Sequence, residues 1–411
     1  MSRTFAAAAL VGAIAAGGVC QPARSGFITV ERRDGCWTFI APDGVPFRAH
    51  GVDWVNYDGF KDARTGRRLY KEANEAQFGG DRALWAADAV KKLKGWGFNA
   101  LGSGCSGELR HRGLCHDGFL MINEFYQNKP DYLIGPKFPN VFHPEWESFC
   151  DAKAKATCAP EANDRDMVGW FFGNEFHWWG SGKGVWRYGL FNDAAQLPDS
   201  HFAKRALLDY CGGTTNVPDT VKEGFITLCA ERFFSVTCGA IRRYDPNHLI
   251  IGCRFMGWEG GAISNVWNVA AKYCDVISFN QYPRMTNGVL HVRAEPLTNA
   301  IARVSEWSCG RPLLISEWGF MAKDAGLPCT KGAGQVFADQ RGRAGAVAEF
   351  LREMDACDAV VGYNFFMWVD MPAGGIGAVD GENGNYGLLS ADGTPYGPVV
   401  DAFRAKGRET P

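Results

Sequence analysis

The sequence has almost no net charge to offer a charged partner. Its 43 Lys and Arg against 45 Asp and Glu leave a formal charge of −2, so nothing electrostatic points to nucleic acid or to an anionic membrane. It contains no CxxC, no HExxH and no other metal-ligand spacing, and neither a P-loop nor a dinucleotide-binding glycine motif. We therefore expect no metal, no cofactor and no nucleic-acid partner.

The N-terminus has the pattern of an export signal. Arg3 precedes an apolar, Ala-rich run over residues 5–16, and small residues continue to Val19. The run is too short for a stable membrane span. We expect residues 1–23 to be a signal peptide and the protein to be secreted or periplasmic. A lipid-modified Cys20 is an alternative that the preceding valine fits poorly.

Cysteine is abundant, at 14 residues. Export permits disulfides, and the pairs nearest in sequence are Cys105/Cys115 and Cys150/Cys158. Spacing does not fix connectivity, and the alternative is that several of these residues are buried thiols in helices and strands.

Two short apolar runs each end in a glutamate beside aromatic residues. Residues 167–172 have the length of a buried strand and lead to Glu175, and residues 313–315 lead to Glu317, which is followed by Trp318. A carboxylate is costly to bury alone, so a glutamate at the end of a buried strand indicates either a functional role or a structural partner. Aromatic surroundings raise a carboxyl pKa and can stack on a sugar ring, and paired carboxylates on different strands perform glycoside hydrolysis. The alternative is a core strand that ends in a structural ion pair.

Eight strand-like runs alternate with helices along the chain. The runs are residues 47–52, 98–101, 119–125, 167–172, 248–255, 275–280, 313–316 and 360–368. The expected helices are residues 81–94, 145–156, 221–243, 262–273, 296–308, 335–356 and 398–406. This alternation predicts an α/β fold, a (β/α)8 TIM barrel, in which active-site groups gather at the carboxyl ends of the strands. A doubly wound open sheet is the alternative, but it needs a phosphate or nucleotide loop that we do not find.

Two segments lie outside the repeating pattern. Residues 26–47 read as an N-terminal β-hairpin, and residues 180–218 form a long irregular insertion after strand 4, broken by a short helical piece. A barrel of this length is ordinarily one domain, so we expect residues 24–411 to form a single catalytic domain. By its length and position, the insertion is predicted to wall off one end of a cleft.

With these residues placed, the chain resembles the clan A glycoside hydrolases. Their signature is Asn-Glu at the end of strand four and a second Glu at the end of strand seven, matched by Asn174-Glu175 and by Glu317 in ISEWGF, with Tyr282 after the sixth run. The resemblance spans roughly residues 47–404. Within the clan, the segments that look most like β-agarases are FPNVFHPEW (138–146), GWFFGNEFHWWG (169–180), GYNFFMWVDMPAGGIG (362–377) and NYGLLSADGTPYGPV (385–399).

The resemblance implies a retaining mechanism. Glu175 would be the general acid/base and Glu317 the nucleophile. Asn174 would bond the sugar 2-hydroxyl, Tyr282 would hold Glu317 ionised, and Trp368 would floor the subsite of the cleaved ring. Retention requires carboxyl groups about 5–5.5 Å apart, and inversion about 6.5–9.5 Å.

Further residues beside strand ends are candidates for substrate binding. They are Asp53, His177, Glu259 and Trp318. Each has a structural alternative, such as loop capping for Asp53 or a satisfied structural histidine for His177. For the neighbouring tryptophans, Trp178, Trp179 and Trp258, ordinary packing competes with a role as sugar platforms.

The leading hypothesis is a secreted retaining glycoside hydrolase that acts on an agar-like β-galactan. A β-mannan, a β-glucan or a simple β-galactoside would suit the same two glutamates, and a transglycosylase would use the same first step. A non-catalytic carbohydrate-binding barrel is the alternative from another class, disfavoured because both glutamates are present. The sequence predicts neither exo or endo action nor an oligomeric state.

Overall fold

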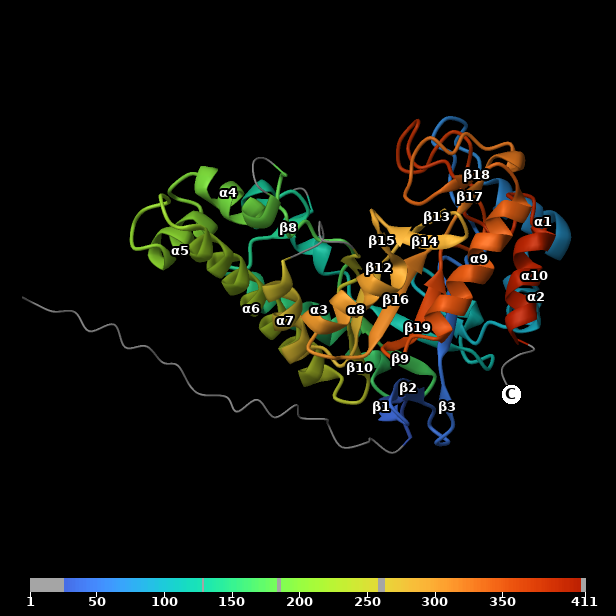
Figure 1. The fold of residues 1–411 in the computed structure, drawn as a ribbon, viewed down its shortest axis with the longest axis horizontal. Helices are drawn as coiled ribbons and strands as arrows, with labels where there is room; N and C mark the ends of the chain where they lie inside the picture. The colour runs from blue at the N-terminus through green and yellow to red at the C-terminus, as the bar shows by residue number, and fades with distance from the viewer. Residues whose placement is uncertain (1–25, 128, 183–185, 258–262, 408–411) are drawn as a thin grey trace, which may run out of the picture.

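The computed structural model describes residues 26–127, 129–182, 186–257 and 263–407 (Figure 1). The predicted signal peptide with Cys20 lies outside the described residues, as do Trp258 and Glu259.

A parallel sheet forms the centre of the molecule. Its order is β10-β9-β6-β5-β4-β19-β16-β12-β11, and every neighbouring pair is parallel. The strands are β4 (Ala49–Val52), β5 (Ala100–Leu101), β6 (Cys115–Phe119), β9 (Met167–Phe171), β10 (Leu249–Gly252), β11 (Phe255–Met256), β12 (Ile277–Asn280), β16 (Leu313–Trp318) and β19 (Val360–Phe365). All five residues of β9 are buried, as expected for a strand covered on both faces.

The two ends of this sheet belong to one strand. Only two residues separate β10 from β11, so together they form the fifth strand of an eight-stranded barrel. The carbonyl oxygen of Ile250 in β10 accepts a hydrogen bond of 3.2 Å from the N–H of Val276, directly before β12, which closes the ring. The predicted (β/α)8 barrel is confirmed.

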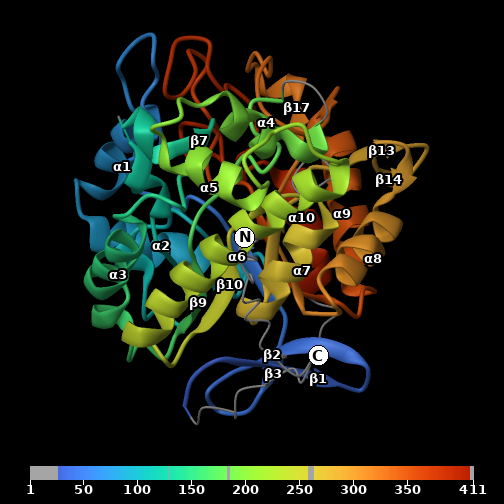
Figure 2. The ribbon, with the colours of Figure 1, turned by 90° about the vertical axis from the view of Figure 1, so that its left-hand side faces the viewer.

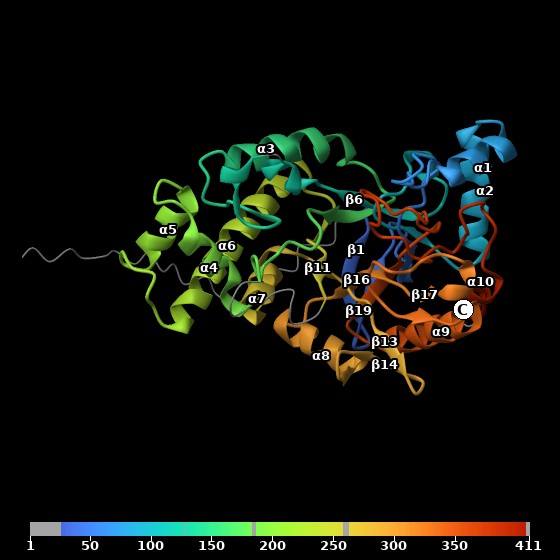
Figure 3. The ribbon, with the colours of Figure 1, turned by 90° about the horizontal axis from the view of Figure 1, so that it is seen from above.

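Helices surround the strands (Figures 1 and 3). They are α1 (Leu69–Phe78), α2 (Arg82–Gly95), α3 (Trp146–Thr157), α6 (Asp219–Tyr244), α7 (Ser264–Tyr273), α8 (Leu297–Trp307), α9 (Gln340–Asp355) and α10 (Gly397–Gly407). Asp81 caps α2 by accepting from the N–H groups of Ala83 (2.8 Å) and Leu84 (3.1 Å). By length and composition α6 could cross a membrane, but 56% of its most apolar window is buried in the fold, where it packs against α3 and α7.

A small antiparallel sheet closes the amino end of the barrel. It contains β1 (Thr29–Arg33), β2 (Cys36–Ile40) and β3 (Pro46–Phe47), and it lies below the barrel in Figures 1 and 2. Ile28 and Phe39 pack there against interior residues of the barrel strands, among them Val168 and Leu314. Because this end is plugged by side chains, the carboxyl ends of the strands are left to carry a site.

The insertion after strand 4 is more regular than predicted. Residues 180–218 contain α4 (Gly189–Gln196), which the sequence did not reveal, and α5 (Phe202–Tyr210), and both project from the barrel beside the start of α6 (Figure 1). Shorter strands decorate the remaining loops: β7 (Leu133–Gly135), β8 (Phe138–Pro139), β13 (Arg284–Thr286), β14 (Val289–Val292), β15 (Glu295–Pro296), β17 (Met321–Ala322) and β18 (Val336–Phe337).

The position predicted for the third strand is wrong. The strand is β6, which ends at Phe119, and Ile122–Tyr126 is a 3-10 helix whose Ile122 and Phe125 are buried in the core. The prediction failed because β6 contains the polar residues His116 and Asp117, which are not typical of a buried strand. His116 bonds Asp164 at 2.9 Å, and the carboxylate of Asp117 accepts from Asn364 at 3.2 Å, so polar residues are satisfied within a strand.

The thirteen described cysteines are all free thiols. Cys150 and Cys158, a pair near in sequence, are both buried in the core cluster. The buried-thiol alternative therefore holds for six of the described cysteines, which are Cys150, Cys158, Cys229, Cys238, Cys253 and Cys274.

Candidate active site

Glu175 is placed by a tight turn after β9. Its φ of 50° lies in the left-handed region, and its N–H donates to the carbonyl of Arg254 at 3.0 Å. Gly173 in the same turn has φ 153°, and a Cβ there would lie 2.0 Å from the ring of Phe176. The turn thus needs glycine, and it directs the glutamate to the carboxyl end of the barrel.

Glu317 lies within β16 and is 9% exposed. The hydroxyl of Tyr282 donates to its Oε2 at 2.8 Å, and Arg254 donates to its Oε1. The register of β16 shifts against both neighbouring strands near this residue. Two donors therefore orient one carboxylate at the strand end.

Arg254 occupies the break between β10 and β11. Its φ of 51° interrupts the strand, and its guanidinium, 2% exposed, lies inside the top of the barrel. It donates to an amide, a hydroxyl and two carboxylates, which are Asn174 Oδ1 at 2.8 Å, Ser103 Oγ at 2.8 Å, Asp53 Oδ2 at 3.1 Å and Glu317 Oε1. A buried cation needs paired charges and hydrogen bonds, and these contacts take up four of the five N–H donors of Arg254.

Asn280, at the end of β12, joins the two glutamates. Its Nδ2 donates to Glu175 Oε1 at 2.9 Å and to Asn174 Oδ1 at 3.1 Å, and its Oδ1 accepts from Ser316 Oγ at 2.8 Å. Glu175 and Glu317 therefore belong to one hydrogen-bond network that runs through Asn280, Asn174 and Arg254.

The two glutamates have different surroundings. Burial, followed by the charge of Glu317, raises the pKa of Glu175 to about 7, against the opposing effects of Asn280 and Arg254. Glu317 instead accepts hydrogen bonds from a guanidinium and a phenol. Burial and the charge of Glu317 raise the pKa of Tyr282 well above its usual value, so its hydroxyl keeps the proton that it donates.

A cleft of about 640 Å³ opens beside Glu175. Asn280 and Tyr282 line it, together with the β13–β14 segment and Glu382. Glu382 is the second carboxyl that lines this cleft, and burial, followed by the charge of Glu317, raises its pKa. The cleft thus gives a substrate access to Glu175.

Two tryptophans predicted to bind substrate lie in the core instead. Trp318 is 0% exposed and stacks on Phe350 with ring centroids 3.7 Å apart. Successive side chains of a strand point to opposite faces, so when Glu317 faces the barrel, Trp318 faces the helices. Trp368 is 1% exposed, and its Nε1 donates to the hydroxyl of Tyr70 at 2.8 Å. Neither ring offers a face to a ligand.

Other predicted residues are placed as follows. Trp178 is 2% exposed and packs among core phenylalanines, which confirms the packing alternative. Asp53 is 0% exposed, and its carboxylate accepts hydrogen bonds from Arg254 and, at 2.9 Å, from the N–H of Ser103, so its place in the structure is beside Arg254. The ring of His177 stacks on that of Trp179 with centroids 4.4 Å apart, and the role of His177 in substrate binding stays a prediction.

Sequence reasoning missed Arg254, Asn280, Glu382 and Ser103. Asn280 ends the sixth predicted strand directly before Gln281-Tyr282, so its position was a usable signal. Arg254 gave no such signal because the run 248–255 reads as one continuous strand, whereas the chain breaks there. Glu382 comes from a loop far along the chain.

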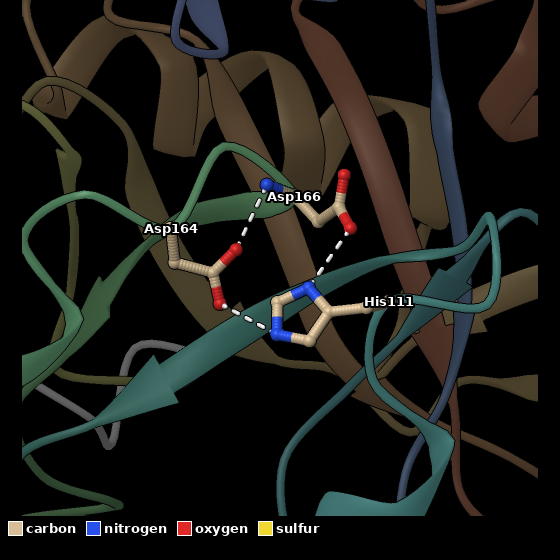
Figure 4. A group of neighbouring side chains, drawn as sticks. All are labelled: His111, Asp164 and Asp166. Carbon is tan, nitrogen blue, oxygen red and sulfur yellow. Dashed lines mark hydrogen bonds and ion pairs between the residues drawn. The ribbon is translucent and has the colours of Figure 1, made fainter.

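His111, Asp164 and Asp166 form a separate polar group whose ligand atoms lie within 4.8 Å of one another (Figure 4). The two ring nitrogens of His111 lie 3.1 Å from Asp166 and 3.6 Å from Asp164. Both aspartates precede β9, whereas Glu175 follows it, so the group lies at the opposite end of the barrel. Among the described residues it is the set that could hold a cation, and it takes no part in the site.

Comparison with known proteins agrees with the barrel fold. No protein-family model matches the chain. In sequence it is similar to beta-agarase B of Vibrio sp. (strain JT0107), with 23% identity over 92% of this chain and 48% of that protein. Beta-agarase A of the same strain is 25% identical over 78% of this chain and 35% of that protein. The chain thus spans about half or less of the length of these curated relatives.

Solved structures show the same fold. The crystal structure of an agarase has a TM-score of 0.75 at 22% identity and covers 94% of this chain and 63% of that one. An exo-beta-agarase has a TM-score of 0.76 at 20% identity and covers 94% of this chain and 65% of that one. These structures share the barrel fold of this chain, and in sequence the chain is similar to proteins named beta-agarase.

Proposed function

We propose that this chain is a secreted, retaining glycoside hydrolase that cleaves β-linked galactan of the agar type. The observation that carries the proposal is the pair Glu175 and Glu317 at the ends of β9 and β16, which belong to one hydrogen-bond network. Burial raises the pKa of Glu175, whereas Glu317 accepts hydrogen bonds from Arg254 and Tyr282. The similarity to proteins named beta-agarase supports the substrate class. Export is supported by the N-terminal sequence pattern alone.

In the first step Glu175 acts as the acid. With a pKa of about 7 it retains a proton near neutrality, and that proton passes to the oxygen of the leaving sugar. Glu317, oriented by Tyr282 and Arg254, attacks the anomeric carbon and forms a glycosyl ester as the glycosidic bond breaks.

In the second step Glu175 acts as the base. Esterification removes the negative charge of Glu317, which is one of the two causes that raise the Glu175 pKa. The pKa of Glu175 falls, so the carboxylate can take a proton from water while that water attacks the ester. Glu317 leaves as a carboxylate, and the sugar keeps its original anomeric configuration.

The network also prepares a contact with the sugar. Asn174 Oδ1 accepts from both Arg254 and Asn280, which fixes the amide orientation and leaves its Nδ2 to donate to a substrate hydroxyl. Asn174 is exposed, as such a contact requires.

Product analysis tests this function. Wild type, Glu175→Gln and Glu317→Gln are incubated with agarose, β-mannan and mixed β-glucan, and soluble products are identified by mass spectrometry. We expect galactan oligosaccharides from agarose alone, and a loss of about 10²–10⁴-fold or more in either variant. Release from mannan or glucan alone would contradict the substrate, and undiminished turnover by both variants would contradict the catalytic pair.

A further inference from the structure

One tryptophan is exposed beside the catalytic network. Trp54 directly follows Asp53 and is 38% exposed, whereas the other tryptophans with described side chains are buried or half-buried. Among the described residues, its Nε1 donates no hydrogen bond. Tryptophan side chains are usually largely buried, so a solvent-exposed indole next to the buried charge network indicates a ligand-binding surface.

The backbone holds this ring in place at some cost. Trp54 has φ 58°, a region that bulky residues rarely adopt, and its N–H donates to the carbonyl of Ser103 at 2.8 Å. The indole lies over Gly104, where a Cβ would be 2.6 Å from the ring. Phe60 packs beside it with ring centroids 5.5 Å apart. The exposed indole is therefore fixed before any ligand arrives.

The aromatic pair opens onto a hollow of about 750 Å³. Its wall combines the two rings with hydrogen-bonding side chains, which are Asn56, Asp58, Lys61, Arg68, Lys71 and Arg82. Flat apolar faces surrounded by donors and acceptors match a sugar ring, which has an apolar face and a rim of hydroxyls.

The hollow adjoins the catalytic cleft across one loop. Ile376 and Gly377 line the hollow, and Glu382 lines the cleft beside Glu175. Ile376 pairs with Glu382 in an antiparallel bridge, with a hydrogen bond of 3.0 Å from its N–H to the Glu382 carbonyl. A saccharide chain leaving the cleft thus meets the hollow on the other side of this pairing.

We propose that Trp54 and Phe60 form a second saccharide subsite, in which a galactan ring stacks on the indole while its neighbour in the chain occupies the catalytic cleft. The inference rests on the proposed function for the identity of the sugar. The subsite adds affinity for long chains, because its contacts are made only when the chain extends beyond the cleft.

Binding to an inactive background tests the subsite. Glu317→Gln is titrated calorimetrically with an agarose-derived hexasaccharide, alone and combined with Trp54→Ala, with Phe60→Ala or with Leu84→Ala. Leu84 is the control because it is an exposed hydrophobic residue (57%) on α2 that lines neither the cleft nor the hollow. Circular dichroism confirms that each variant is folded, and Phe60→Ala keeps the test valid if the Trp54 variant does not fold. Wild-type turnover of agarose is measured in parallel.

We expect Trp54→Ala to raise Kd for the hexasaccharide about tenfold, with a smaller rise for Phe60→Ala and no change for Leu84→Ala. Affinities within twofold of the parent, in an enzyme whose wild type degrades agarose, would overturn the subsite and leave the function standing. Trp54-dependent binding without any turnover of agarose would support the subsite and overturn the hydrolase. Absence of both would overturn the two together.

Discussion

Glu175 should destabilise the fold at neutral pH, and Glu175→Gln should remove that effect. Its pKa in the folded protein is raised from 4.5 to about 7, with burial as the largest cause. A carboxyl with a raised folded-state pKa contributes stability that is full below pH 4.5 and is lost as pH rises through 7. Each pKa unit corresponds to about 1.4 kcal/mol, so the loss at pH 7 is about 3 kcal/mol. Glutamine keeps the Oε1 that accepts from Asn280.

The assay is urea unfolding at several values between pH 4.5 and 8. We expect Glu175→Gln to match wild type near pH 4.5 and to exceed its free energy of unfolding by about 3 kcal/mol at pH 7. Glu306→Gln is the control, since Glu306 is an exposed glutamate that makes no ion pair among the described residues. Parallel curves for wild type and Glu175→Gln would refute a buried acid at this position.

Three further predictions, each for one substitution with its rescue or control where needed, test the network and its scaffold. Arg254→Met should lower the free energy of unfolding by about 3–5 kcal/mol, because it leaves two buried carboxylates unpaired. A second change, Asp53→Asn, should restore part of this loss in the same urea assay, and a loss below about 1 kcal/mol would contradict the pairing. Tyr282→Phe removes a 2.8 Å hydrogen bond to the nucleophile and should lower kcat about 10–100-fold, as steady-state kinetics on agarose would show; an unchanged kcat would speak against it. Gly173→Ala should lower Tm by several degrees through its clash, whereas Gly345→Ala, in open space on α9, should raise it slightly; equal shifts in thermal melts would be inconsistent with this turn.

The barrel was predictable because its signals are local and repeated. Apolar runs such as β9 and β16 alternate with amphipathic helices, and the capping residue Asp81 marks a helix start. The third strand failed because its polar residues find partners only in the folded barrel, as Asp117 does in Asn364. Helix α4 was hidden in a segment rich in turn residues.

The candidate site was predictable at its strand ends and not between them. Glu175, Glu317 and Tyr282 follow strand-like runs, so position alone brought them together. The position of Arg254 depends on a break in the fifth strand, which no pattern of residues in the sequence predicts. The prediction for Trp368 failed because an aromatic side chain at a strand end can point outward to the helices as readily as inward. Here the ring points outward, and its Nε1 donates to the hydroxyl of Tyr70.

The central claim is double displacement by Glu175 and Glu317, and the anomeric configuration of the first product tests it most directly. Agarose is digested in an NMR tube, and the anomeric proton signals are followed before mutarotation sets in. The account predicts that the β-anomer appears first and then equilibrates. Initial release of the α-anomer would contradict it, because inversion requires a single displacement by water and leaves no role for Glu317 as nucleophile.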